Sequence, residues 1–403
     1  MLLKLGPVLV VDERSSWDGR WVTLTLREEG IQQIEPAPPG EWYISPGWVD
    51  GLCWSGQPQD VAEPLAQLAH RAMKGGFTTI WVGGWHGWEE EAILEEIAAQ
   101  RVQLPVAIHF IAAWADKQGK ITPIESLRER GAAGWSLPPL HIMPWRTLAR
   151  CLPYLRHVGG VVFCLPYWEG AEGEGGVPDA PDLALSGWQG IPEYAETAAI
   201  HLIAEVAQHW GGSIAVGPIT TAKGLRLART YGLHVFTAIP YLVADTTKLS
   251  EYDAFWKLHP PLRTTDDRKA LLEAIWQSDM DMIVSWDYAA SPEEKDKEWK
   301  HAGFGQRTLE IGVALLWNEL WNLAQGRVSL THLVRAMSEK PRRLLGLPPC
   351  RIEVGQPLDF TVFRLKPQPT PLPPPWDAHS SALEVGGIIR RLADADSLRS
   401  QRF

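Results

Sequence analysis

The sequence is short of cysteine, of long apolar runs and of positive charge. Its four cysteines among 403 residues show no Cys-x-x-Cys spacing, which excludes a disulfide framework and a zinc ribbon and fits a reducing cytoplasm. No segment approaches the roughly 18 apolar residues of a membrane span, and Asp12 interrupts the apolar start before any cleavage site. We therefore expect a cytoplasmic protein without a membrane partner.

The charge balance narrows the choice of partner. The chain has 38 Lys and Arg against 48 Asp and Glu, a formal charge of −10. Because no net positive field is available, nucleic acid is not expected as the main partner. Tryptophan is abundant instead, with 21 residues, and 45% of the chain is hydrophobic, enough for a large core.

Apolar strands alternate with amphipathic helices between residues 46 and 350. One example is the apolar segment 78–84 followed by the helical pattern at 89–101. Repeated strand–helix units predict a parallel sheet with right-handed crossovers, and about 300 residues of them favour an α/β fold with a closed (β/α)8 barrel of the TIM type.

Both ends of the chain have β character. Residues 1–45 contain short alternating strands separated by turns, and 351–365 return to the same pattern, so together they predict a small β-domain beside the barrel. Residues 366–403 begin with a proline-rich stretch, which predicts an extended tail or arm.

Eight stretches, in order, resemble the dihydroorotase branch of the cyclic amidohydrolases, whose metal-dependent hydrolase barrel is flanked by a small β-domain built from both chain ends. They cover most of the chain and lie at 45–50, 74–82, 190–207, 219–243, 259–275, 281–295, 329–347 and 354–363. The resemblance implies this fold for the whole chain.

In that family a zinc-bound hydroxide attacks a ring amide, and zinc needs imidazole or carboxylate ligands. The positions that the resemblance assigns to the ligand histidines read Leu52, Trp54, Cys164 and Pro218. The bridging carboxylate or carbamylated lysine would fall within 136–138, which reads Ser-Leu-Pro. We therefore expect no zinc and no other cofactor.

The remaining site positions are replaced as well. Trp286 stands at the position of the catalytic aspartate, and Asp287 lies one residue away, where a strand points to the opposite face. The substrate-binding arginine and asparagine fall on Gly56 and Trp85. Because Trp54, Trp85 and Trp286 all replace polar site residues, we predict that their rings plug the barrel mouth.

Three functions remain open. The preferred one, which the resemblance implies, is a non-catalytic structural subunit for the aspartate transcarbamoylase catalytic subunit in pyrimidine biosynthesis. We also expect the chain to form a homo-oligomer, most simply a dimer. The second is an active cyclic amidohydrolase with a relocated site, and the third is a binding module that accepts a small ring in the barrel mouth. Candidate residues for a relocated site are Asp287, His259, His109, Asp245, Cys53 and Cys164.

Overall fold

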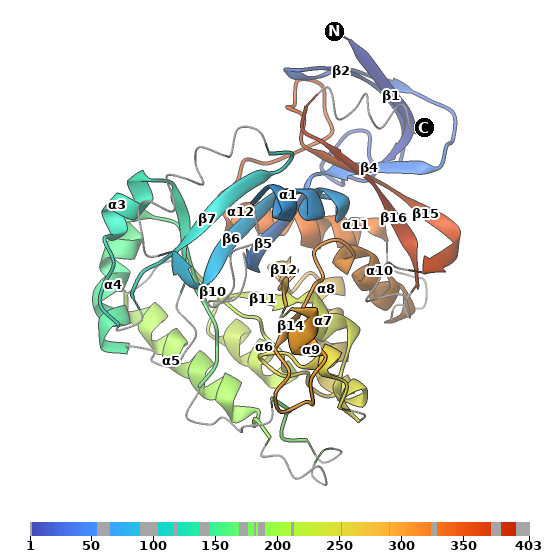
Figure 1. The fold of residues 1–403 in the computed structure, drawn as a ribbon. Helices are drawn as coiled ribbons and strands as arrows, with labels where there is room; N and C mark the ends of the chain where they lie inside the picture. Colours follow the sequence, from blue (N-terminus) through green and yellow to red (C-terminus); the bar gives the residue numbers. More distant parts are fainter. Residues whose placement is uncertain are drawn as a thin grey trace.

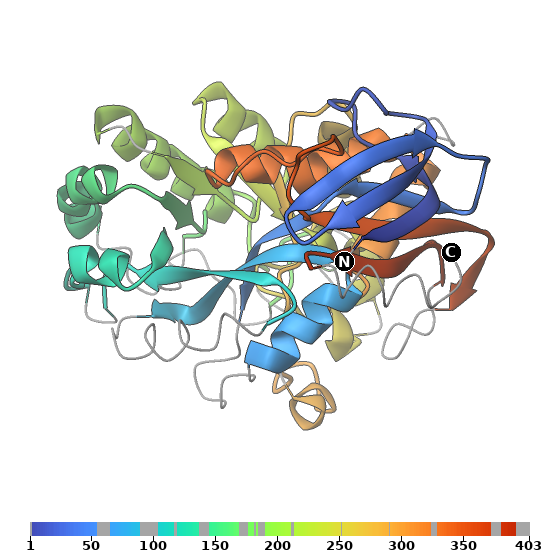
Figure 2. The same ribbon diagram turned by 90° about the horizontal axis from the view of Figure 1, so that it is seen from above.

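Two β-sheets organise the chain in the computed structural model (Figures 1 and 2). The structure describes residues 2–54, 65–88, 104–116, 119–136, 145–168, 176–180, 183, 190–210, 213–250, 252–289, 291–323, 329–371 and 380–391. One sheet has eight strands and forms a barrel, and the other has six and lies beside it. A two-stranded ribbon of β13 (Tyr288–Ala289) and β14 (Gly305–Gln306) follows the last barrel strand.

The eight-stranded sheet is parallel and its strands are neighbours in chain order. The strands are β5 (Trp48–Trp54), β6 (Phe77–Trp88), β7 (Ala107–Ala113), β8 (Ala132–Ser136), β9 (Val161–Cys164), β10 (Ile214–Val216), β11 (His234–Ala238) and β12 (Met282–Val284). Parallel neighbours need a crossover, and helices provide most of these connections. The predicted (β/α)8 barrel is confirmed.

The barrel is nearly closed where β5 meets β12. In the described residues these two strands share no ladder of backbone hydrogen bonds, but one side chain joins them. The Oδ1 atom of Asp50 accepts from the backbone N–H of Ser285 at 3.1 Å and of Leu52 at 3.3 Å. Gly51 permits the close approach, because a Cβ there would lie 2.0 Å from the sulfur of Met282.

Helices surround the barrel in Figure 1. They are α1 (Leu65–Lys74), α3 (Ile124–Glu129), α4 (Trp145–Val158), α5 (Tyr194–Trp210), α6 (Ala222–Thr230), α7 (Ile239–Val243), α8 (Thr265–Trp276), α9 (Pro292–Lys295), α10 (Gly312–Leu323), α11 (Leu330–Val334) and α12 (Lys340–Leu344). Local chemistry sets their starts: Thr264 and Asp267 form a reciprocal capping box at α8, which satisfies amides that the first turn leaves unpaired. None of the helices in the described ranges is both long and apolar enough to cross a membrane.

The six-stranded sheet is built from both ends of the chain, as predicted. Its order is β16 (Ser380–Ile389), β15 (Phe360–Pro371), β4 (Trp42–Pro46), β1 (Leu3–Val10), β2 (Trp21–Arg27) and β3 (Gly30–Pro36). It takes in more of the C-terminal region than the sequence predicts, because the expected boundary at residue 365 lies inside β15 and part of the expected arm, 366–403, forms β16. Prolines are tolerated there because β15 pairs irregularly beyond residue 365 and Pro lacks only the donor N–H.

Trp48 at the start of β5 fastens the two sheets together. Its ring is fully buried, lies 5.3 Å from the ring of Phe363 on β15 and donates from Nε1 to Ser45 Oγ at 3.0 Å. Thr361 Oγ1 accepts from the Trp48 backbone N–H and donates to the Gly76 carbonyl. The barrel is therefore held against the small sheet by packing and by satisfied polar groups.

Candidate functional site

Large rings fill the interior of the barrel. The ring of Trp81 on β6 lies 6.1 Å from that of Phe163 on β9, which lies 6.0 Å from that of Phe236 on β11. These strands are not neighbours in the sheet, so the side chains meet across the inside of the barrel. The interior is a packed core at this level, as in other barrels of the class.

Two glycines make room for these rings, Gly134 on β8 and Gly217 directly after β10. A Cβ at Gly134 would lie 2.8 Å from the Trp81 ring, and one at Gly217 would lie 2.8 Å from the Phe236 ring. The sequence reasoning missed this filling, since it sought the plug in other tryptophans. The sequence signal for this filling is a large aromatic residue on one predicted strand, such as Trp81, combined with a glycine on another, such as Gly134.

The orientation of Phe163 decides what Cys164 can do. Successive side chains of a strand point to opposite faces, so Cys164, next to inward-facing Phe163, points to the outer layer and pairs in register with Val216. Burial raises the pKa of its thiol to about 12, and only a thiolate is a good zinc ligand. Cys53 likewise points outward, since it pairs with Val82, the neighbour of inward-facing Trp81.

The other positions assigned to metal ligands offer zinc no donor set. Leu52 is buried and has no donor atom, and Pro218 follows a cis peptide bond at the end of β10. Ser136 lies at the carboxyl end of β8, where its hydroxyl makes no hydrogen bond in the described part of the chain. Within the described ranges no three His, Cys, Asp or Glu side chains converge on a point that could hold a metal.

Part of the predicted site lies outside the described residues. This holds for Gly56 and for positions 137 and 138. Trp54 and Trp85 lie in β5 and β6, but the description does not extend to their side chains. Of the three tryptophans predicted to plug the barrel mouth, only Trp286 has a side chain that the structure describes.

Trp286 is buried, with 3% of its surface exposed, and follows Ser285 at the end of β12. Its backbone has a positive φ of 57°, which is uncommon for a non-glycine residue and reorients the side chain relative to a continuing strand. Its Nε1 and the hydroxyl of Tyr288 both donate to the His259 carbonyl at 3.2 Å. This hydrogen bond and the burial fix the orientation of the Trp286 indole.

His259 is partly exposed and lies against two aromatic rings. Its imidazole lies edge-on to the ring of Tyr167, with centroids 4.7 Å apart, and to that of Phe304 at 5.9 Å. The peptide bond to Pro260 is cis, and the Pro260 carbonyl accepts from the hydroxyl of Tyr241 at 2.8 Å. These rings around His259 make its surroundings a packed aromatic cluster.

Asp287 points toward the helical layer. Its Oδ1 accepts from Arg71 of α1 at 2.7 Å and from the backbone N–H groups of Thr308 and Leu309 at 2.6 and 2.9 Å. The side chain is 3% exposed. Three donors on one buried oxygen give this carboxylate a structural role before the start of α10.

The other candidates for a relocated site lie apart from one another. Asp245 accepts from Thr247, at the start of a 3-10 turn, and from Arg268 of α8 at 3.0 Å. His109 on β7 stacks on Trp81, with centroids 5.2 Å apart. Each has its own partners, so the described residues do not assemble them into one acid–base pair with His259.

A buried polar network beside β10 was not anticipated. Glu196 of α5 accepts hydrogen bonds from the backbone N–H and hydroxyl groups of Thr220 and Thr221, at 2.5 to 3.1 Å. Burial raises its pKa, although nearby Arg263 acts in the opposite direction. Arg263 also donates to the Ile191 carbonyl at 2.7 Å. This network fixes the start of α6 against α5.

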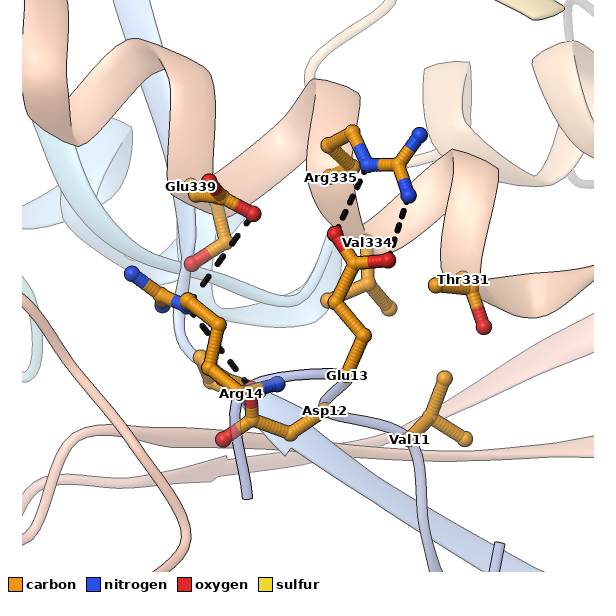
Figure 3. A pocket seen from close by; sticks show the side chains of 10 residues that line it. Val11, Asp12, Glu13, Arg14, Thr331, Val334, Arg335 and Glu339 are labelled. Atoms are coloured by element: carbon orange, nitrogen blue, oxygen red, sulfur yellow. Dashed lines mark hydrogen bonds and ion pairs between the residues drawn. The ribbon is translucent and has the colours of Figure 1, made fainter. Parts of the chain in front are cut away.

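A small cavity of about 10 Å³ lies between the segment 11–14, which follows β1, and the helical segment 331–339 (Figure 3). This volume holds about one water molecule. Ion pairs occupy its rim: Glu13 with Arg335, and Arg14 with Asp12 and Glu339. The hydrogen bonds from Arg335 lower the pKa of Glu13. The cavity joins the sheet to η7 (Arg335–Glu339) and has no room for a substrate.

Comparison with known proteins gives a consistent relationship. No family model matches the chain. It is 29% identical to a dihydroorotase of Thermus aquaticus, over 82% of this chain and 81% of that protein. It is 26% identical to a dihydroorotase of Pelotomaculum thermopropionicum, over 79% and 77%, and to a probable dihydroorotase-like protein of Synechocystis, over 89% and 93%.

Solved structures share the fold. The L-hydantoinase of Arthrobacter aurescens superposes with a TM-score of 0.78 over 96% of this chain and 94% of that one, at 18% identity. The dihydroorotase of Saccharomyces cerevisiae superposes with a TM-score of 0.67 over 86% and 98%, at 11% identity. The chain is thus dihydroorotase-like in sequence and has the fold of these cyclic amidohydrolases.

Proposed function

We propose that this chain is a non-catalytic dihydroorotase homologue whose barrel serves as a structural subunit. The observation that carries the proposal is the end of β12. There Trp286, at the position of the family's aspartate, is fixed on the His259 carbonyl, and the adjacent Asp287 is engaged by Arg71. Proton transfer to a leaving amide needs a carboxylate within hydrogen-bond reach of the substrate, and Asp287 faces the other way.

The ligand positions support the same proposal. Leu52 and Pro218 bring no donor atom, and the buried thiol of Cys164 faces outward. Zinc would supply a hydroxide nucleophile in this superfamily, but these residues do not fit it. The protein accordingly binds no zinc at the barrel mouth and does not hydrolyse dihydroorotate.

Metal content and turnover test this part of the proposal. The full chain, purified after growth with zinc, is analysed by mass spectrometry for bound metal and assayed for dihydroorotate hydrolysis with added zinc, beside an active dihydroorotase. We expect less than one zinc per chain and no turnover above the protein-free rate. Stoichiometric zinc with turnover would overturn the proposal, and loss of that turnover in Asp287→Asn would favour the relocated site instead.

We further infer that the structural partner is the aspartate transcarbamoylase catalytic subunit, in cytoplasmic pyrimidine biosynthesis, and that the chain self-associates as a dimer. The support is the family resemblance together with the retention of the eight-stranded barrel and the small sheet around the replaced site residues. Light scattering of the chain alone measures the homo-oligomer. Co-expression with an aspartate transcarbamoylase from the same cell, followed by size exclusion, tests the partner, and independent elution would contradict it.

A further inference from the structure

The chain between β13 and β14 forms a strap, residues 291–304. The antiparallel pairing of β13 with β14 closes the base of the strap, and inside it the backbone N–H of Gly303 donates to the Glu294 carbonyl at 3.0 Å. The strap places the ring centroid of Phe304 5.9 Å from that of His259. Because His259 is partly exposed, the strap covers one side of its imidazole beside the barrel mouth.

Two lysines tie the strap to the segment 254–257 by crossed contacts. Lys257, on that segment, donates from Nζ at 2.7 to 3.2 Å to three carbonyls of the strap, those of Trp299, Lys300 and Ala302. Lys295, on the strap, donates from Nζ at 2.8 and 3.3 Å to two carbonyls of the segment, those of Ala254 and Lys257. Each ammonium group therefore holds the backbone of the opposite segment.

The ammonium group of Lys295 is held by neutral carbonyl groups rather than by carboxylates. The charged residues that act on it are Lys257, which repels it, and Asp253, which attracts it. Asp253 also caps a 3-10 turn, and Glu294 takes part in the capping box of α9. The remaining charged or titratable residues of the strap are exposed to water: Glu293, Asp296, Lys297, Glu298, Lys300 and His301.

These surroundings disfavour the charged form of Lys295. Burial removes water from the ammonium group and the like charge of Lys257 opposes it, so that its pKa falls from 10.5 to about 7. When the strap opens, Lys295 returns to water and regains its ordinary affinity for a proton. Opening between these two pH values therefore takes up a proton, so a rising pH favours the closed strap and a falling pH favours the open one.

We propose that the strap 291–304 is a pH-dependent cover beside the barrel mouth, held shut by the crossed contacts of Lys257 and Lys295 and opened by a proton taken up at Lys295. Opening moves Phe304 away and uncovers one side of the His259 imidazole. Each pH unit above neutrality makes the open form about tenfold rarer. The device depends on neither metal nor turnover, so it stands whether or not the function proposed above holds.

Hydrogen exchange of the unaltered full chain, read by mass spectrometry at pH 8 and pH 9, tests the proposal without any variant. Where closing is faster than exchange, an amide whose opening is independent of protons exchanges about tenfold faster per pH unit. We expect this increase in α8 but a change of less than about threefold over 297–304, because opening becomes rarer over the same interval. An equal increase in both places would overturn the proposal.

Lys295→Met removes the group that takes up the proton and keeps an unbranched side chain of similar length. In this variant, exchange over 297–304 should recover most of the increase of about tenfold between pH 8 and pH 9. Lys297→Met is the matched control, because Lys297 is exposed on the same strap and its loss should leave the flat response intact. A flat response in Lys295→Met, or its loss in Lys297→Met, would place the proton elsewhere and overturn the proposal.

A second measurement reads the proton on the lysine directly. Isotope labelling of lysine at Nζ gives one resonance per side chain, and the resonance missing from Lys295→Met identifies Lys295. In the unaltered protein this resonance should titrate near neutral pH, because burial and Lys257 lower the pKa of Lys295 to about 7. Titration above pH about 9, as for a lysine in water, would leave no proton to take up on opening and would overturn the proposal.

Discussion

Asp50 joins the first and last strands of the barrel, and it does so as a buried acid. Its Oδ1 bridges the backbone of Ser285 and Leu52, while its Oδ2 has no hydrogen-bond partner among the described residues. Burial, the largest effect, raises its pKa from 3.8 to about 6. A carboxyl group that is easily protonated therefore lies at the seam that backbone pairing leaves open.

Asp50 makes stability depend on pH. Because the folded state holds its proton more tightly than the unfolded state, the free energy of unfolding contributed by this group is highest below pH about 4 and falls as the pH rises through 6. Two pKa units correspond to about 3 kcal/mol. Asp50→Asn keeps an acceptor for both amides and should remove this fall, as measured by urea unfolding between pH 4.5 and 7. Identical pH slopes for variant and wild type would exclude Asp50 as the cause.

The ion pair of Asp287 and Arg71 allows a second test at the scale of the residue. Removing one partner leaves the other charge buried, so Asp287→Leu should lower the free energy of unfolding by about 3 to 5 kcal/mol. Combining it with Arg71→Met removes both charges and should recover much of that loss. Equal destabilisation of the single and double variants in urea unfolding would show that the hydrogen bonds to Thr308 and Leu309 dominate instead.

At the scale of elements, the segment between α9 and β14 is fastened by lysines rather than by regular structure. Lys257 is buried and its Nζ donates to the carbonyls of Trp299 and Ala302 at 2.7 and 2.8 Å. Lys295 donates to the Ala254 carbonyl at 2.8 Å. Lys257 therefore fixes the backbone just before Phe304, one of the rings around His259, and Lys295 ties the end of α9 to the segment 254–257.

Lys257→Met should loosen this segment without unfolding the barrel. Losing its hydrogen bonds leaves buried carbonyls unpaired, so local opening should become easier by about 3 kcal/mol, or roughly 100-fold faster amide exchange over 299–306. Hydrogen exchange read by mass spectrometry measures this. Lys248→Met is the matched control, since Lys248 is exposed, and comparable acceleration in both variants would contradict the role of Lys257.

Patterns among neighbouring residues predicted the strands and helices of the barrel well. The alternation of strands and amphipathic helices gave the barrel, because periodicity depends only on neighbouring residues. Thr264, ahead of Asp267, is a capping signature of the same kind. The pairing of Asp287 with Arg71 crosses 216 positions, and the meeting of Trp81 with Phe163 depends on strand order around the barrel, so neither could be predicted from local pattern. The prolines after residue 366 predicted an extended arm, because local composition does not reveal that this segment pairs with β16.

At the scale of the whole molecule, two kinds of polar contact join the barrel and the small sheet in addition to the packing of Trp48. One is the rim of ion pairs in Figure 3, where Glu13 and Arg335 remain partly exposed. The other is buried: Arg342 of α12 donates to the Gly47 carbonyl at 3.1 Å and to Asp359 Oδ2 at 2.6 Å. Gly47 and Asp359 lie where the chain passes from the sheet to the barrel and back, so Arg342 holds both crossings.

Arg342→Met should therefore destabilise the whole protein more than Arg335→Gln does. The first change leaves buried acceptors unpaired at both crossings, with an expected loss of about 3 kcal/mol. The second breaks a partly exposed ion pair, which contributes less than about 1 kcal/mol and is screened by salt. Urea unfolding at low and high salt measures both. Arg342→Met should also separate the transitions of sheet and barrel, since their coupling depends on these crossings, whereas one unchanged cooperative transition would show that Trp48 packing alone couples them.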